Sequence, residues 1–183
     1  MRFCIFLPAI GALLFLSGCG YHRVGSAANL PSTVHTIAIP VFQNKTQSYH
    51  TEVAMTNAVI REFNDRTSLS VVPGGRAGEA DATLRGVIVS ESVQPLTYKT
   101  QTTGSVAGAN SSFTSSFLIT VNASVVVTDR DGRVLYNHTN YVFHEQYETT
   151  SDLVSFVQED SPAVRRLSRD FAQTLVGDIL ESF

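Results

Sequence analysis

The sequence SSFLITVNASVVVTDRDGRVLYNHTNYVFHEQY, residues 115–147, decides the fold of this 183-residue chain. In its first half, apolar residues stand at every second position, and most of the residues between them are small and polar. A period of two places the two kinds of side chain on opposite faces of a β-strand. The apolar row is Phe117, Ile119, Val121, Ala123, Val125 and Val127, and the polar row is Thr120, Asn122, Ser124 and Thr128.

Residues 129–132, Asp-Arg-Asp-Gly, have the composition of a tight turn, because Asp tolerates compact backbone geometry and Gly adopts a positive φ without steric cost. The return strand, residues 133–147, repeats the alternation on one parity at Leu135, Tyr141, Phe143 and Tyr147. Asn137 and Thr139 interrupt this row, so the pattern does not define the pairing register. A hairpin of this length needs a cover over its apolar face, which the rest of the chain should supply.

The first 19 residues have the pattern of a targeting segment and not of a folded element. One basic residue, Arg2, precedes an apolar run at residues 3–15, which is short for a membrane span. The next four residues resemble the lipobox of bacterial lipoproteins at every position: Leu16, Ser17, Gly18 and Cys19. The resemblance implies cleavage after residue 18 and a covalent lipid on the Cys19 thiol. The alternative is an ordinary secretory signal whose cysteine is incidental.

Cysteine usage agrees with this interpretation. The only other cysteine, Cys4, lies in the segment expected to be removed, so the mature chain has no disulfide and relies on its core. Residues 19–183 are enough for one domain with such a core. Gly20 follows the cysteine, whereas Asp at that position favours inner-membrane retention in enterobacterial lipoproteins. The resemblance therefore implies an outer-membrane location, with the domain on the periplasmic side.

Charge argues against one class of partner. Without Arg2 the chain has 12 basic and 16 acidic residues, a formal charge of −4, and it contains no basic run. This composition argues against nucleic-acid binding. Charged residues make up 16% of the chain, below the usual quarter, and hydroxyl side chains are abundant. Such a surface suits a protein enclosed by a partner, although small β-rich domains share it.

The segments before the hairpin predict one domain, residues 33–183, behind a lipidated tether at residues 19–32. Their patterns predict strands at 34–41, 69–72 and 81–93, a helix at 51–66, and a loop at 96–116. In the first strand we expect Ile37, Ile39 and Val41 on one face. Strand 81–93 is apolar on both parities in its middle, which indicates cover on both faces at least in part. The apolar arc of the helix consists of Val53, Met55, Thr56, Val59, Ile60 and Phe63.

The C-terminal segment predicts a second helix. Ser161 is a typical N-cap and Pro162 a typical first helical residue, so we expect a helix from there to Phe183, after a short helical lead-in at 150–157. Its apolar stripe is Val164, Leu167, Phe171, Leu175 and Ile179. The predicted fold class is α+β: two helices packed on one face of a mixed, mostly antiparallel four- to five-stranded sheet.

Residues 100–116 carry no charge and consist mainly of Ser, Thr, Gly and Ala. One interpretation is a flexible surface loop. The other is a loop that packs against the wall of a partner, where charged groups would be costly to desolvate.

The order of several short strings resembles LptE, the family of lipopolysaccharide-assembly lipoproteins. The strings are Gly18-Cys19-Gly20-Tyr21-His22, Leu30-Pro31-Ser32-Thr33, Ile37-Ala38-Ile39-Pro40-Val41-Phe42, Glu62-Phe63-Asn64-Asp65-Arg66-Thr67, Thr120-Val121-Asn122-Ala123-Ser124-Val125, Glu159-Asp160-Ser161-Pro162-Ala163 and Arg169-Asp170-Phe171-Ala172. The resemblance implies a lipid-anchored plug in the lumen of the outer-membrane barrel LptD, where it supports barrel assembly and lipopolysaccharide export. It implies no enzymatic activity and no cofactor beyond the lipid on Cys19. Family members also bind lipopolysaccharide.

Basic side chains near the ends of the sheet are the expected contacts for lipopolysaccharide phosphates. The nearest candidates are Lys99, Arg130 and Arg133, although solvated turn charges would look the same. No metal site is expected. Residues 129–132 open like a calcium loop but lack the Glu at its twelfth position, and His144-Glu145 has no second His at helical spacing.

Two other function classes compete with the plug. A lipoprotein adaptor of another secretion or envelope machine would share the anchor and the early strand. An envelope hydrolase would need a nucleophile with a base, and no G-x-S-x-G or phosphate-binding motif is present. We therefore expect a non-enzymatic protein.

Overall fold

The computed structural model describes residues 33–75, 78–102, 110–148 and 153–182. Within these ranges the elements follow in the order β1 (Thr36–Ile39), β2 (Gln43–Asn44), α2 (Thr51–Arg66), β3 (Ser70–Pro73), β4 (Ala82–Thr102), β5 (Asn110–Asp129), β6 (Val134–Glu148) and α3 (Leu153–Glu181). The expected signal peptide, the lipobox and the tether lie outside the described residues.

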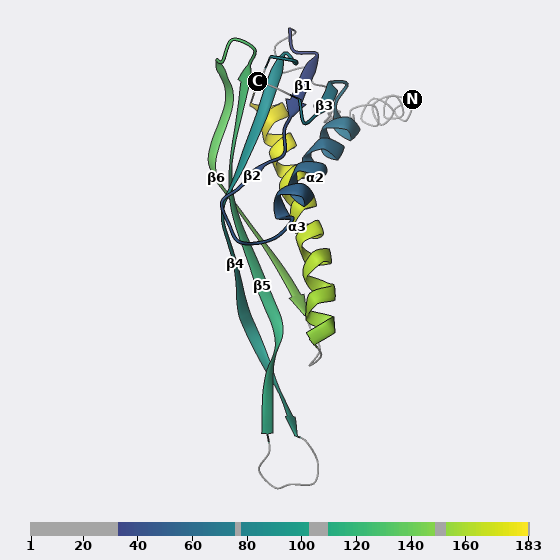
Figure 1. Ribbon diagram of the computed structural model, residues 1–183, viewed down its shortest axis with the longest axis vertical. Helices are drawn as coiled ribbons and strands as arrows, with labels where there is room; N and C mark the ends of the chain where they lie inside the picture. Colours follow the sequence, from purple (N-terminus) through teal and green to yellow (C-terminus); the bar gives the residue numbers. More distant parts are fainter. Residues whose placement is uncertain (1–32, 76–77, 103–109, 149–152, 183) are drawn as a thin grey trace, which may run out of the picture.

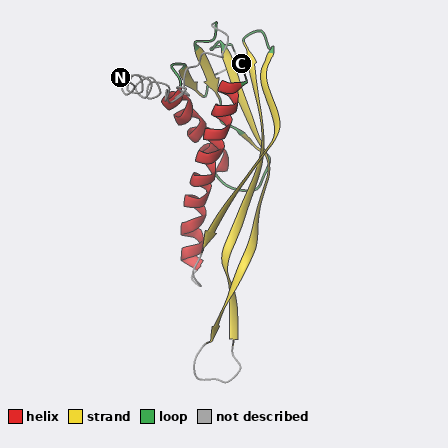
Figure 2. Ribbon diagram, turned by 180° about the vertical axis from the view of Figure 1, so that it is seen from behind, coloured by secondary structure: helices red, strands yellow, loops and turns green. Residues whose placement is uncertain are grey.

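The described strands form one six-stranded sheet in the order β3-β1-β4-β5-β6, with β2 paired to β4. The short strands β1, β2 and β3 pair in parallel, whereas β4, β5 and β6 pair antiparallel. Both α2 and α3 lie on the same side of this sheet (Figures 1 and 2). The predicted α+β class with two helices on one face of a mixed sheet is confirmed, with one strand more than the upper expected number.

The molecule is long and narrow, because the β4–β5 hairpin continues well past the start of α3 as a two-stranded ribbon (Figure 1). The expected loop at 96–116 is therefore wrong for its described residues. Tyr98 pairs with Thr114, and Thr102 pairs with Asn110. Ser, Gly and Asn favour loops by composition, but pairing between two strands satisfies the backbone regardless of the side chains.

The apolar row of β5 forms the floor of the core, as predicted. Five of its members are buried: Ile119, Val121, Ala123, Val125 and Val127. Shifts in the β5–β6 register explain why the sequence pattern does not define how the return strand pairs. Ala123 pairs with Tyr141 but Val125 pairs with His138, so β6 carries an extra residue there. Such a β-bulge reverses the parity of the strand, and the inward row continues at Tyr136 instead of Asn137.

Phe171 of α3 occupies the centre of the core and is fully buried. Its ring meets Phe42, Tyr141 and Phe143 edge to face, at centroid distances of 6.0, 5.7 and 5.5 Å. Gly86 of β4 lies under Phe42, and a Cβ atom there would overlap the Phe42 ring. The aromatic cluster thus joins the segment before β2, the strand β6 and the helix α3.

Helix α2 has the predicted bounds, and Met55, Val59 and Phe63 are buried as expected. Val53 is 40% exposed, so the buried arc is narrower than predicted. Val41 is 60% exposed, because β1 ends before Pro40 and the alternation of the strand ends with it. Val89 is 46% exposed: β4 is central, but helices cover only one of its faces.

Helix α3 confirms the predicted stripe, since Leu167, Phe171, Leu175 and Ile179 are all buried and Val164 packs against the core. Its predicted start at Ser161 is wrong, because the helix begins at Leu153 and Pro162 lies inside it. An internal proline forgoes one backbone hydrogen bond, but its fixed φ is compatible with a helix. Among the described helices, none is long and apolar enough to cross a membrane.

Candidate functional site

The helices cover one side of the sheet and leave the opposite face open (Figure 2). Residues that alternate with the buried row of β5 point to this face, and their cross-strand partners share it. On β5 these are Thr120, Asn122, Ser124 and Val126; on β4 they include Arg85, Ser90, Ser92 and Gln94; on β6 they include Val142, His144 and Gln146. We call this set the open face.

Neutral polar groups dominate the open face and bond across its strands. Thr120 Oγ1 and His144 Nδ1 are 2.9 Å apart, and Asn122 Nδ2 donates to Asn140 Oδ1 at 3.0 Å. Asn122 Oδ1 is buried and has no hydrogen-bond partner. Such a face can form many weak, neutral hydrogen bonds with another polar surface.

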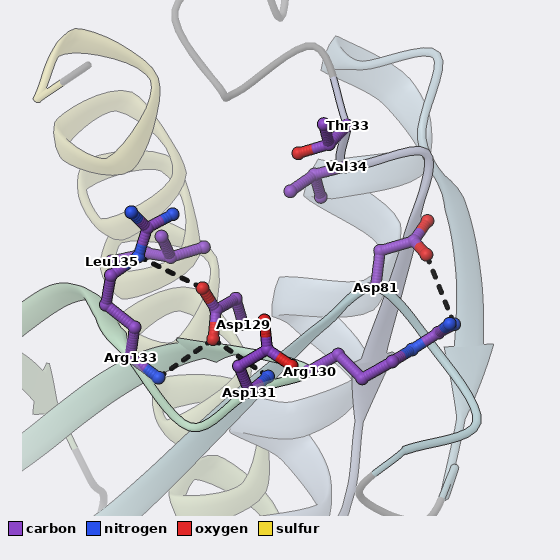
Figure 3. Close-up of a pocket in the computed structure, with 8 residues that line it drawn as sticks. All are labelled: Thr33, Val34, Asp81, Asp129, Arg130, Asp131, Arg133 and Leu135. Carbon is purple, nitrogen blue, oxygen red and sulfur yellow. Dashed lines mark hydrogen bonds and ion pairs between the residues drawn. The ribbon is translucent and has the colours of Figure 1, made fainter.

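The β5–β6 turn, which lies at one end of the molecule (Figure 1), lines a charged hollow of about 290 Å³ (Figure 3). Asp129 organises the turn: its Oδ1 accepts from the backbone N–H groups of Asp131 and Arg133, and its Oδ2 accepts from Arg133 Nε at 3.1 Å. Gly132 has φ +85°, the left-handed conformation expected of a turn glycine. The predicted turn at 129–132 is confirmed.

Asp81 joins this turn to the start of β1. It accepts from the backbone N–H groups of His35 and Thr36 and from the Thr36 hydroxyl, and it pairs with Arg130 at 3.3 Å. These bonds lower the pKa of Asp81: the His35 N–H has the largest effect, followed by the two Thr36 donors, with a smaller contribution from Arg130. The carboxylate thus fastens β1 to the segment before β4.

The three predicted lipopolysaccharide contacts are not brought together. Arg130 and Arg133 share the turn, but each already has a carboxylate partner, Asp81 and Asp129 respectively. Lys99 lies on β4, where it pairs with Phe113, and the β4–β5 ribbon runs toward the end of the molecule opposite the β5–β6 turn (Figure 1). The three residues therefore cannot form a single anion site, and each remains a separate prediction.

A partly buried hydrogen-bond chain links β6 to α3, and no sequence pattern predicts it. The hydroxyl of Tyr136 bonds that of Tyr141, which donates to Asp178 Oδ2 at 2.7 Å. Burial, reinforced by these two bonds, raises the pKa of Tyr141 far above its ordinary value. Both tyrosine hydroxyls keep their protons at physiological pH, and their hydrogen bonds fasten the helix to the sheet. Only the β-bulge places Tyr136 and Tyr141 on one face, which is why a period of two missed the pair.

Within the described ranges, no group of three or more His, Cys, Asp or Glu residues is arranged to hold a metal ion. The expected lipid site, Cys19, and its preceding motif, Leu16, Ser17 and Gly18, fall outside those ranges.

The fold and the open face define a class: an elongated two-layer α+β module that shields one face of its sheet with helices and presents the other. The family model described as lipopolysaccharide-assembly, LptE, matches residues 34–179. The chain therefore belongs to the LptE family of envelope lipoproteins, whose members are assembly factors of the outer membrane and not enzymes. No curated protein sequence matches the chain.

Solved structures with little sequence similarity align with most of the chain, and the first of them, at a TM-score of 0.50, shares the fold. A protein from Xanthomonas campestris is 13% identical, with a TM-score of 0.50, over 83% of this chain and 89% of its own. A protein from Caulobacter crescentus is 8% identical, with a TM-score of 0.49, over 77% and 88%. The rare lipoprotein B from Shewanella oneidensis is 11% identical, with a TM-score of 0.44, over 80% and 92%.

Proposed function

We propose that this protein is anchored to the outer membrane by a lipid on Cys19 and acts as the plug and assembly partner of an LptD-type barrel in lipopolysaccharide transport. Membership of the LptE family supports the pathway. The observation that carries the plug role is the open face: a mainly neutral polar surface that continues along three strands of a narrow molecule.

The lumen of an outer-membrane barrel is a polar environment for a plug. Lumen walls are polar, so a plug gains little by exposing apolar residues and loses by burying unpaired charges. Hydroxyl, amide and imidazole groups avoid both problems, because they exchange water for wall groups at small net cost. The contact should therefore be broad, with its free energy spread over many weak bonds.

The anchor would set the orientation. The 14 residues 19–32 precede Thr33, which lies beside the β5–β6 turn (Figure 3). Fully extended, a segment of this length reaches at most about 50 Å. The end of the molecule with β1 and the charged turn would thus stay near the anchoring leaflet, and the β4–β5 ribbon would point away from it.

Contact with lipopolysaccharide would be secondary to the contact with the barrel. Arg130 and Arg133 are exposed, with side chains 60% and 72% accessible, so a phosphate could replace their carboxylate partners at low cost. We propose these two and Lys99 as weak, separate contacts.

Affinity purification of the tagged, full-length protein from detergent-solubilised outer membrane tests the proposal. The expected result is one large β-barrel protein in near-equal amount. Recovery of a periplasmic machine without a barrel would overturn the plug role and favour the adaptor function.

A further inference from the structure

One arginine on the open face has no charged partner. Arg85 lies near the start of β4 and is exposed, whereas its neighbours Leu84 and Gly86 are buried on the helical side, so the Arg85 side chain points to the open face. Among the described residues, its guanidinium group forms no hydrogen bond and no ion pair. The arginines that do form ion pairs lie on the helices or in the β5–β6 turn: Arg66, Arg130, Arg133 and Arg166.

The strands beside Arg85 present neutral side chains to it. Its cross-strand neighbour on β5 is Val126, which in turn pairs with Asn137 of β6. Val87 is the next residue of β4 on the same face, and both valines are half-buried. On the other side of β4, the connection between β1 and β2 at residues 40–42 is Pro-Val-Phe. The guanidinium group is therefore surrounded by apolar and amide groups and not by carboxylates.

The nearest charges along β4 do not compensate Arg85 either. Asp81 comes four residues earlier, which corresponds to about 13 Å of strand, and its carboxylate already pairs with Arg130. In the other direction the next charged neighbour is Lys45, whose N–H donates to the Ile88 carbonyl at 3.1 Å, and it is also a cation. Within the described ranges, Arg85 is thus an uncompensated positive charge on this part of the open face.

Enclosure by a barrel would change the cost of this charge. In water an exposed, unpaired arginine costs little, because solvent screens it and occupies its donors. Against a lumen wall the guanidinium group would lose part of that hydration, and an ion that is withdrawn from water without a partner is strongly destabilising. The wall that faces Arg85 must therefore supply the opposite charge. This step rests on the proposed function.

We propose that Arg85 forms an ion pair with a carboxylate on the lumen wall of the partner barrel, and that this pair fixes the rotation of the plug in the lumen. The two valines cover the aliphatic stem, and the planar guanidinium group can hold a carboxylate through two parallel hydrogen bonds. A lipid with several phosphates would favour clustered bases, whereas neither Val126 nor Asn137 is basic. The broad neutral contact contributes most of the binding, and the ion pair selects one orientation.

The test combines crosslinking with a charge reversal in the full-length protein. A photo-crosslinking amino acid at Asn137, on the same face and one strand beyond Val126, maps the wall residues near Arg85. Co-purification from detergent-solubilised outer membrane then measures how much barrel Arg85→Glu recovers. Arg61→Glu, on α2 on the other side of the sheet, is the matched control. Both arginines are exposed, so both variants should unfold at the wild-type temperature.

We expect Arg85→Glu to lower barrel recovery about tenfold, because it places two carboxylates against each other, and Arg61→Glu to leave recovery unchanged. The mapped wall segment should contain an Asp or Glu, and changing that acid to Arg should restore recovery with Arg85→Glu.

Three results would overturn this inference alone: a barrel recovered equally by wild type and Arg85→Glu, a mapped wall segment without an acid, or crosslinks from Asn137 to lipopolysaccharide. A wild-type protein that recovers no barrel would remove the proposed function, and this inference with it.

Discussion

Replacing Phe171 by alanine tests the central packing of the domain. The ring is fully buried and makes three edge-to-face contacts, with Phe42, Tyr141 and Phe143, that no smaller side chain can keep. Truncating a buried phenylalanine costs about 3–5 kcal/mol, and each aromatic pair adds about 0.5–1.5 kcal/mol to what area burial alone contributes. We therefore expect Phe171→Ala to lower the unfolding free energy by about 4–5 kcal/mol, near the upper end of the range for a buried phenylalanine.

Equilibrium unfolding of the full-length protein in urea measures this loss. With the m-value unchanged, the whole effect should appear as a lower midpoint. Asp170→Ala, at the exposed preceding residue of α3, is the control and should change the unfolding free energy by about 0.5 kcal/mol or less. A loss below about 1 kcal/mol for Phe171→Ala would refute the placement of this ring at the centre of the core.

Four further predictions test other parts of the molecule. Gly86→Ala should lower the unfolding free energy by about 1–3 kcal/mol, because the added methyl overlaps the Phe42 ring. The double variant with Phe42→Leu should recover part of this loss, as measured by unfolding in urea. Cys19→Ser should leave the chain unacylated, and persistent labelling by a fatty-acid analogue would disprove the anchor. Folding lowers the pKa of Asp81 below its usual 3.8, so the contribution of this carboxylate to stability is complete above that pH and is lost as the pH falls further. The difference in unfolding free energy between Asp81→Asn and wild type should therefore shrink below pH 3.8. A difference that stays constant with pH would contradict this. Arg133→Ala should leave barrel co-purification unchanged, because its side chain is 72% accessible and a single exposed charge contributes little; a severalfold loss would mean that the contact is not broad.

Patterns with a single period were predictable from the sequence. The buried row of β5, the bounds of α2 and the stripe of α3 each follow from repeated apolar spacing against one neighbouring layer. Fold class and the tight turn followed from the same residues. Family membership was also predictable, because it rests on the order of short strings along the chain.

Features that depend on pairing were not predictable. The ribbon beyond Leu96 forms because two polar strands pair their backbone hydrogen-bonding groups. The sequence of either strand alone does not predict this pairing. The extra residue in β6 reverses its parity and so hides the hydrogen-bond chain from Tyr136 to Asp178. Pro162 reads as a helix start, yet the helix continues on both sides of it. Local signals define where an element can begin, and the tertiary contacts decide whether it does.

Photo-crosslinking from the open face tests the plug function most directly. Probes at Ser92 of β4 and His144 of β6 lie on the face that should meet the lumen wall, and both residues are exposed. In cells that express the full-length protein, both probes should crosslink to the same outer-membrane barrel. Crosslinks from both positions to soluble periplasmic proteins alone, with none to a barrel, would contradict the proposed function.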